Sequence, residues 1–182
     1  MVRFRGAQLG TSFGATHWRR EGPGLAAAAV VCLATVTSIS WTPHPVLVWN
    51  ASASSPQGLY LVSSAHGLHR GEWALAWPPA QARRLAARRH YLPAGVPLVK
   101  KVAAIAGDRV CAYGATIRIN GHVVAIRNPA DPSGRPLPRW SGCTILREGQ
   151  AMLLGTSGPH SFDGRYFGTS DQHDILGSAR RL

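Results

Sequence analysis

The chain has 182 residues, enough for one ordinary domain with a short appendage. Apolar residues make up 45% of it and charged residues 15%, so it can bury a core and does not have the composition of a disordered protein. The formal net charge of +12 is compatible with nucleic acid or an anionic membrane surface as a partner. No helix-turn-helix, zinc-finger or aromatic RNA-binding pattern accompanies this charge, so we expect membrane lipid rather than nucleic acid as the main anionic partner.

A long uncharged segment lies near the N-terminus. Residues 24–41 carry no charged side chain and few polar ones, and their number is close to the roughly 20 residues that a helix needs to cross a membrane. Tryptophans flank the segment and two consecutive arginines precede it, as expected when the N-terminal end stays in the cytoplasm. We therefore predict a cytoplasmic segment (1–23), a single transmembrane anchor (24–41) and an extracytoplasmic domain (42–182).

Two other interpretations of this segment stay open. Ala-rich stretches of similar length serve as cleaved signal peptides, and an apolar helix can also be buried in a core. The residues that follow offer only poor small-x-small cleavage sites, at 35–37 and 37–40. An uncleaved anchor therefore fits the sequence best.

The rest of the chain is typical of short strands separated by turns. Its 13 prolines and 20 glycines suit a β-rich fold better than a helical bundle. Apolar or alternating runs predict strands at 45–49, 58–63, 72–77, 97–106 and 150–154.

Three further segments have a clear local signature. Asn120-Gly121 between extended residues predicts a two-residue type I′ hairpin within 116–123. Residues 80–90 predict one short helix with Leu85 as its main apolar anchor, and residues 128–140 predict a loop. The expected fold class is mostly β, a sheet or barrel-like domain with one short helix behind the N-terminal transmembrane helix.

Two local features indicate chemistry. Residues 50–60 place several serines in a bend between apolar strands, and Lys100 and Lys101 interrupt the apolar strand at 97–106. Adjacent strand residues point to opposite faces, so one of the two lysines faces the apolar side. A serine hydroxyl needs a neighbouring base to become a nucleophile, and a desolvated lysine can be that base when its pKa falls. A plain turn and a snorkelling lysine are the alternatives.

Three motifs occur in an order found in a known family. Ser52-Ala53-Ser54-Ser55-Pro56 resembles the nucleophile box of type I signal peptidases. The apolar strand around Lys100-Lys101, closed by Gly107-Asp108, resembles their lysine box. The stretch SFDGRYFG at residues 161–168 resembles their C-terminal box. The chain is most similar to the TraF-type branch, the peptidases of conjugative transfer systems.

The resemblance assigns roles by position. It implies that Ser54 is the nucleophile and Lys100 the general base, while the Ser52 hydroxyl and the Ser54 N–H form the oxyanion hole. It implies that Ser161 orients the lysine amine and that Asp163 and Arg165 form a structural ion pair. The sequence departs from the family where Gly155-Thr156-Ser157-Gly158 replaces Gly-Asp-Asn, at Gly164 instead of Ser, and at Ser55 instead of an apolar residue.

The resemblance also implies a function. We expect a serine endopeptidase in the bacterial inner membrane, with its catalytic domain in the periplasm, that processes a pilin precursor through an acyl-enzyme. Some TraF-type enzymes close the pilin into a ring, and the sequence leaves open whether water or an amine of the substrate releases the product here. It implies a protein substrate and no cofactor. The alternatives are a general signal peptidase for secreted proteins, a soluble LexA-like autoprotease, against which the predicted anchor argues, and a basic membrane-tethered scaffold without enzymatic activity.

The three cysteines form no CxxC or Cys/His pattern, so the sequence predicts no metal site. Cys32 falls within the predicted anchor. Cys111 and Cys143 remain as a pair that an oxidising compartment would allow to form a disulfide. Two buried thiols are the alternative.

Overall fold

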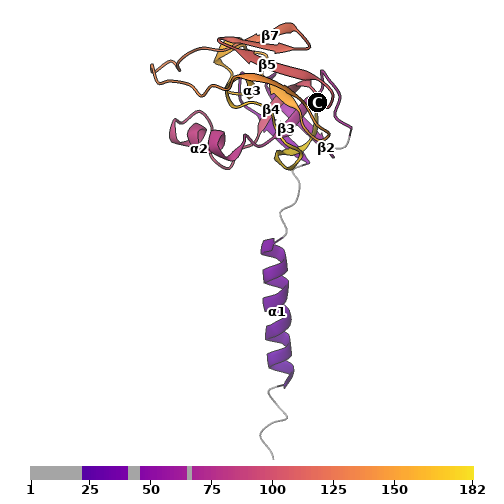
Figure 1. The fold of residues 1–182 in the computed structure, drawn as a ribbon. Helices are drawn as coiled ribbons and strands as arrows, with labels where there is room; N and C mark the ends of the chain where they lie inside the picture. Colours follow the sequence, from indigo (N-terminus) through magenta and orange to yellow (C-terminus); the bar gives the residue numbers. More distant parts are fainter. Residues whose placement is uncertain (1–21, 41–45, 65–66) are drawn as a thin grey trace, which may run out of the picture. The chain divides into compact units, whose positions relative to one another are not determined.

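The computed structural model of the protein describes residues 22–40, 46–64 and 67–182 (Figure 1). The chain divides into two compact units, Met1–Pro43 and His44–Leu182. Helix α1 (Gly22–Ser40) belongs to the first unit and coincides with most of the uncharged segment. Within the described residues no helix has both the length and the hydropathy of a membrane span, so the predicted span at 24–41 is not confirmed. Most of the predicted cytoplasmic segment and the first residue of the strand predicted at 45–49 lie outside the described residues.

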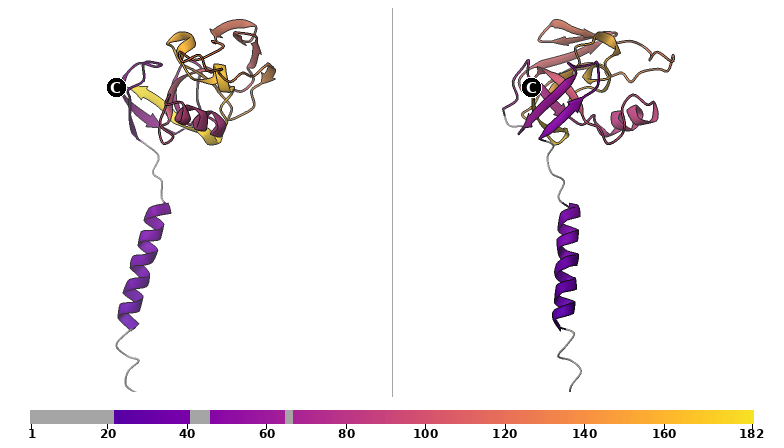
Figure 2. Two further views of the ribbon diagram at one scale, coloured as in Figure 1. Left: turned by 90° about the vertical axis from the view of Figure 1, so that its left-hand side faces the viewer. Right: turned by 180° about the vertical axis from the view of Figure 1, so that it is seen from behind.

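The second unit is mostly β, as predicted, and contains two antiparallel sheets that Figure 2 shows from two further sides. The larger sheet has the strand order β1-β2-β10-β3-β4-β9 and the smaller has the order β7-β6-β5-β8. The strands of the larger sheet are β1 (Leu47–Asn50), β2 (Gly58–Ser63), β3 (Trp73–Ala76), β4 (Leu98–Ala104), β9 (Met152–Leu154) and β10 (Ile175–Arg181). Those of the smaller sheet are β5 (Arg109–Tyr113), β6 (Thr116–Ile119), β7 (His122–Ile126) and β8 (Gly142–Ile145).

Every predicted strand has a counterpart, and the predicted hairpin is confirmed. Asn120 and Gly121 join β6 to β7 with φ angles of 50° and 88°, the positive values that a type I′ turn requires. The predicted helix is α2 (Ala80–Arg88). Its buried residues are Ala82 and Ala86, whereas Leu85 is only half-buried, so the expectation for Leu85 is wrong. Ala82 and Ala86 are four residues apart and therefore lie on one helix face, where their small side chains allow close packing.

Some elements have no counterpart in the prediction. The domain has a second short helix, α3 (Gly164–Phe167), and the strands β5, β8 and β10 were not expected. Strand β10 lies inside the larger sheet between β2 and β3. A Cβ on its Gly177 would come within 1.9 Å of the Ser63 carbonyl oxygen, so only glycine fits this close approach of two backbones.

Strand β4 carries both lysines of the predicted lysine box. It pairs with β3 on one side and β9 on the other, and Lys100 lies opposite Ala74 in the β3 register. Lys100 is 2% exposed and Lys101 is exposed, in agreement with the expectation that only one of them faces the interior. The bend before β2 is fixed against β4 because the Ser55 hydroxyl donates a hydrogen bond to the Val99 carbonyl at 2.6 Å. The sheet thereby brings the serine-rich bend and Lys100 together.

Candidate active site

The serine-rich bend is held from inside by Asn50, the last residue of β1. Its side-chain amide donates hydrogen bonds to the carbonyls of Ser52, Ser55 and Pro56 at 3.0–3.2 Å. Its Oδ1 accepts a hydrogen bond from the Ser52 N–H at 3.1 Å. Asn50 is 8% exposed, so these bonds satisfy a buried amide and give the bend a fixed shape. Asn50 is absent from the predicted site residues, and an Asn between a predicted strand and Ser-x-Ser was the available signal.

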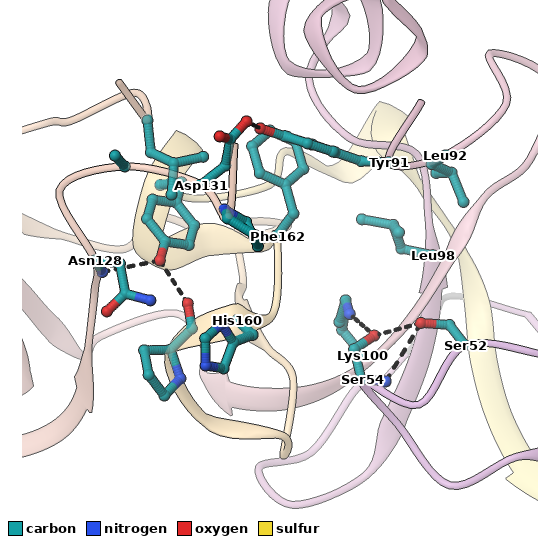
Figure 3. Close-up of a pocket in the computed structure, with 15 residues that line it drawn as sticks. Ser52, Ser54, Tyr91, Leu92, Leu98, Lys100, Asn128, Asp131, His160 and Phe162 are labelled. Carbon is teal, nitrogen blue, oxygen red and sulfur yellow. Dashed lines mark hydrogen bonds between the residues drawn. The ribbon is translucent and has the colours of Figure 1, made fainter. Parts of the chain in front are cut away.

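The candidate nucleophiles differ in burial and in hydrogen-bond partners. Ser55 is 2% exposed, and its hydroxyl is occupied by the Val99 carbonyl. Ser54 is half-exposed, and its hydroxyl lies within hydrogen-bond distance of the Lys100 amine (Figure 3). Ser52 and Ser54 line a cleft, whereas Ser55 does not. The polar residue at position 55 is thus explained by a buried hydrogen bond between the bend and β4.

Lys100 lies between two serine hydroxyls. Besides Ser54, its amine contacts Ser161 Oγ at 3.1 Å, and Ser161 is itself 1% exposed. Burial lowers the pKa of Lys100 from 10.5 to about 8, because the charged ammonium loses its hydration. The Asp163 carboxylate opposes this shift of the Lys100 pKa, and the Arg165 guanidinium adds to it. The neutral amine, the form that can accept a proton, is therefore accessible near neutral pH.

The two groups of the expected oxyanion hole contact each other. The hydroxyl of Ser52 lies 2.9 Å from that of Ser54, and the Ser54 N–H donates to Ser52 Oγ at 3.3 Å (Figure 3). Before a substrate carbonyl oxygen can bind both the Ser54 N–H and the Ser52 hydroxyl, the hydrogen bond from the Ser54 N–H to Ser52 Oγ has to break. Ser52 is exposed at the cleft, so its hydroxyl is free to rotate towards such an oxygen.

Asp163 and Arg165 form a buried ion pair next to the amine. Arg165 Nε contacts Asp163 Oδ1 at 2.8 Å, and Nη2 contacts Oδ2 at 3.1 Å, in a bidentate arrangement. Asp163 Oδ2 also accepts the Gly155 N–H at 2.6 Å, and Arg165 donates to the carbonyls of Gly155 and Gly158. The pair thus connects the start of α3 to the backbone that follows β9, and fixes the segment that carries Ser161.

Gly155 leaves room for this arrangement. A Cβ at this position would lie 2.0 Å from Ser161 Oγ and 2.8 Å from the Ser54 carbonyl oxygen. The Ser54 carbonyl accepts a hydrogen bond from the Thr156 N–H at 2.9 Å, so the backbone after β9 runs directly beside the serine bend. The departure from the family motif at 155–158 therefore keeps a glycine where a side chain does not fit.

The cleft beside Ser54 has a volume of about 330 Å³. Sequence reasoning missed the residues of its far wall, because they come from separate segments that only the fold brings together. Tyr91 and Phe162 are in aromatic contact there, with ring centroids 5.3 Å apart. The Tyr91 hydroxyl contacts Asp131, whose carboxylate also pairs with Arg135 Nε at 2.7 Å. The mostly apolar lining includes Ala130, Pro132, Leu137 and Pro159. Leu92 and Leu98 also line the cleft (Figure 3).

Across the described residues, no group of three or more His, Cys, Asp or Glu side chains is placed to hold a metal ion. The polar side chains that line the cleft belong to Ser52, Ser54, Tyr91, Lys100, Asn128, Asp131, His160 and Tyr166.

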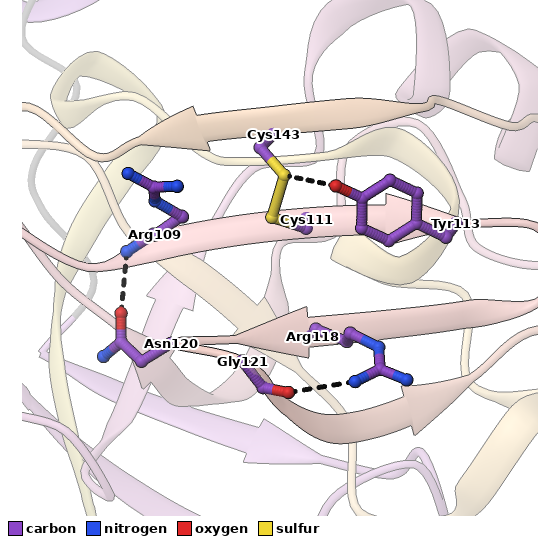
Figure 4. Close-up of a disulfide and its surroundings, with 7 residues drawn as sticks. All are labelled: Arg109, Cys111, Tyr113, Arg118, Asn120, Gly121 and Cys143. Atoms are coloured by element: carbon purple, nitrogen blue, oxygen red, sulfur yellow. Dashed lines mark hydrogen bonds between the residues drawn. A yellow bond between two sulfur atoms is a disulfide. The ribbon is translucent and has the colours of Figure 1, made fainter.

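A disulfide joins Cys111 of β5 to Cys143 of β8, which face each other in the strand register (Figure 4). Their Cα atoms are 4.0 Å apart, and Cys143 Sγ contacts the Tyr113 hydroxyl at 2.9 Å. The bond joins β8, which follows the 128–140 segment, to β5. Residues of that segment contribute to the cleft wall. Cys32 of α1 is an exposed free cysteine.

The chain is similar to several known proteins. The family model described as signal peptidase, peptidase S26 matches residues 21–182. A plasmid transfer protein TraF of Escherichia coli is 35% identical over 139 residues, covering 70% of this chain and 77% of that protein. A probable conjugal transfer protein TraF of Sinorhizobium fredii is 34% identical over 178 residues, covering 92% and 93%. A signal peptidase I structure from Enterococcus faecalis has 20% identity and a TM-score of 0.36, covering 63% of this chain and 98% of that one.

Proposed function

Because the chain belongs to the signal peptidase S26 family and to its TraF type, we propose that it is a serine endopeptidase with Ser54 as nucleophile and Lys100 as general base. The hydrogen bond between the Lys100 amine and the Ser54 hydroxyl, in an open cleft, carries this proposal. The lowered pKa of Lys100 supports it, because a base must be neutral before it can accept a proton.

The reaction begins with attack of Ser54 Oγ on the carbonyl carbon of the scissile peptide bond, while its proton passes to Lys100 Nζ. The carbonyl oxygen becomes negatively charged and binds the Ser54 N–H and the Ser52 hydroxyl. The C–N bond then breaks, the leaving amine takes the proton from Lys100, and an ester links the substrate to Ser54. Ser161 is the positioning residue that holds the amine towards Ser54 in both steps.

The ester is resolved by a second nucleophile. Lys100 takes a proton from water, hydroxide adds to the ester carbonyl, and Ser54 leaves with the proton that Lys100 returns. An amine at the substrate's own N-terminus completes the same sequence and closes the product into a ring, provided that it reaches the ester at high effective concentration. The TraF resemblance is the basis for including this second outcome.

The substrate in this proposal is a pilin precursor of a conjugative transfer system. The support is the similarity over most of the chain to proteins described as plasmid and conjugal transfer proteins. A cleft with an apolar lining suits an extended apolar segment near the cleavage site, which both pilin precursors and other exported proteins offer.

Attachment to a membrane is part of the same proposal. The helix α1 bears no charged residue, and Arg19 and Arg20 precede it. We infer that residues 24–41 hold the catalytic domain, residues 42–182, at the outer face of the inner membrane, with residues 1–23 in the cytoplasm. Alkaline extraction of membranes, with protease added from the periplasmic side, tests attachment and orientation together.

Co-expression with a pilin precursor from the same transfer region, followed by mass measurement of the product's ends, tests the function. A product shortened at a single site in the presence of the wild type, and absent with Ser54→Ala, is expected. A mass lower by one water molecule than that of the linear product indicates ring closure. Cleavage of general secreted preproteins with equal efficiency indicates a housekeeping signal peptidase, and full transfer function of Ser54→Ala indicates a scaffold.

A further inference from the structure

A second cavity lies between α2 and the end of the 128–140 segment. Its volume is about 680 Å³, and we call it the α2 groove. Helix α2 supplies one wall and the segment at Pro138–Trp140 supplies the other, while Tyr166 and Phe167 of α3 complete the lining. None of the predicted catalytic residues lines this groove.

The α2 groove is strongly basic. Arg84, Arg88 and Arg139 line it and are exposed, and no Asp or Glu is among its lining residues. The sequence around α2 has no acidic residue between Glu72 and Asp108. Within the described residues, none of these three arginines forms an ion pair. The groove therefore has a positive charge that the domain itself does not neutralise.

The other arginines of this region already have partners in the fold. Arg83 stacks over the Trp77 ring at 5.4 Å, and Arg89 donates to the Pro136 carbonyl at 2.9 Å. In contrast, Arg84 and Arg88 lie four residues apart on one face of α2, where like charges destabilise a helix. Two like charges at a groove, with no ion-pair partner among the described residues, indicate that an anion from outside the domain binds there.

The groove has apolar surface between its charges. Half-buried Leu85, Trp140 and Phe167 lie among its lining residues. Tyr166 lines both this groove and the cleft beside Ser54, so the two cavities are neighbours. Its hydroxyl donates to the Pro159 carbonyl and accepts the Asn128 N–H, which fixes the ring in this position.

We propose that the α2 groove binds an acidic, extended segment of the protein substrate at a distance from the scissile bond. This proposal rests on the proposed function, because it assigns a second contact to the substrate of that site. An arginine guanidinium can bind a carboxylate through two parallel hydrogen bonds. The apolar surface of Leu85, Trp140 and Phe167 accommodates the side chains between the acidic ones. A concave groove next to the cleft suits a peptide better than a flat lipid surface, which offers nothing to fill a concavity.

The test measures binding apart from cleavage, with the full-length Ser54→Ala protein in mild detergent. The probes are two dye-labelled peptides of equal length without a cleavage site, one with four Glu residues between apolar residues and one with Gln in their place. Fluorescence anisotropy gives the Kd of each. The groove variant carries Arg84→Gln, Arg88→Gln and Arg139→Gln. The control variant removes the same charge from exposed arginines of the smaller sheet and its flank, through Arg109→Gln, Arg118→Gln and Arg147→Gln.

We expect the protein to bind the Glu peptide about tenfold more tightly than the Gln peptide, and the groove variant to lose this preference while the control variant keeps it. The single variant Arg139→Gln lies outside helices and strands, so it tests the same point with the least risk to folding, and we expect a two- to fourfold loss.

Equal affinities for the two peptides, or equal losses in the groove and control variants, overturn the proposal. A groove variant that keeps its peptide affinity but loses binding to phosphatidylglycerol vesicles, or to a short single-stranded DNA, also overturns it in favour of those partners. Because no step depends on cleavage, these outcomes are separate from a failure of the proposed peptidase activity, which the co-expression experiment detects.

Discussion

The amine of Lys100 lies 3.1 Å from the hydroxyl of Ser161, on a residue 61 positions further along the chain. Its second hydroxyl partner is Ser54, and it forms no ion pair with a carboxylate of the part of the chain that the structure describes. The nearby Asp163 accepts two hydrogen bonds from the Arg165 guanidinium and a third from the Arg165 N–H. The amine thus sits among neutral oxygen atoms in a buried position, which is the physical reason for its lowered pKa.

Removal of either member of the proposed dyad should abolish peptide cleavage. We expect Ser54→Ala and Lys100→Ala to lose at least about 10³-fold in kcat/KM, because each removes a group that acts with the other. Lys101→Ala should keep most activity, since its side chain is exposed on the opposite face of β4. Cleavage of a peptide substrate, with circular dichroism to confirm folding, measures this.

Ser55→Ala is the matched control for the nucleophile. It removes the hydrogen bond to the Val99 carbonyl and should cost about 1 kcal/mol of stability while leaving much of the activity. If folded Ser55→Ala is as inactive as Ser54→Ala, the nucleophile is assigned to the wrong serine.

The rate should depend on pH through Lys100. Its pKa of about 8 means that the amine is mostly charged at lower pH, so kcat/KM should rise about tenfold per pH unit up to that value and level off above it. Initial rates between pH 5 and pH 10 give the profile. A rate independent of pH over this range contradicts a lysine base.

The same pKa predicts a change in stability. Because the folded pKa of Lys100 lies below the ordinary 10.5, the unfolded chain binds more protons between about pH 8 and pH 10.5. The unfolding free energy of the wild type, relative to Lys100→Met, should therefore rise with pH in this window, by at most about 1.4 kcal/mol per unit. Urea unfolding of both proteins at several pH values measures the difference. A difference that falls with rising pH contradicts burial as the cause.

The ion pair beside the amine should tune the pH profile in opposite directions. Asp163 raises the pKa of Lys100, so Asp163→Asn should move the midpoint of the rate profile to lower pH. Arg165 lowers the same pKa, so Arg165→Met should move the midpoint to higher pH. Each change also breaks a buried pair and should cost about 3–5 kcal/mol of stability. Loss of folded protein alone changes the amplitude of the profile and leaves its midpoint in place, so the two effects are separable.

A methyl group at position 155 should disturb the site. Gly155→Ala puts a Cβ against Ser161 Oγ and the Ser54 carbonyl, so one of them must move. A displacement on the order of 1 Å at a reacting group costs about 10²-fold in rate, and we expect a loss of that size in kcat. Gly95→Ala is the control, because a Cβ there meets no atom within 4 Å. Equal activity of the two variants contradicts the contact.

The disulfide should contribute to stability in an oxidising compartment. It closes a loop with a sequence separation of 32, so replacing Cys111 and Cys143 with serine should lower the free energy of unfolding by about 3–4 kcal/mol. Cys32→Ser, on α1, should leave it unchanged. Urea unfolding with and without reductant, together with thiol labelling of protein made through the secretion pathway, checks both statements. Labelling of all three cysteines without reductant shows that the bond does not form there.

Local patterns were enough to predict several elements. Asn120-Gly121 determined its hairpin because few residues other than Gly and Asn accept positive φ angles. The strand around Lys100 and Lys101 was predictable from its apolar run, and alternation along it required one lysine to face inwards. The family resemblance of three motifs supplied the site residues that no periodicity indicates.

The sequence by itself determined which residue types are available for a serine–lysine site and on which kind of element they lie. The tertiary structure decided their environment: Ser55 is occupied by Val99 and Ser54 is left for Lys100, because the bend packs against β4 across more than forty residues. It also placed β10 inside the larger sheet, although only Ile175 and Leu176 of this strand are strongly apolar and small residues and two arginines follow them. Sheet pairing, burial and the electrostatic surroundings of a lysine arise between distant segments, and a local pattern contains no information about which segments meet.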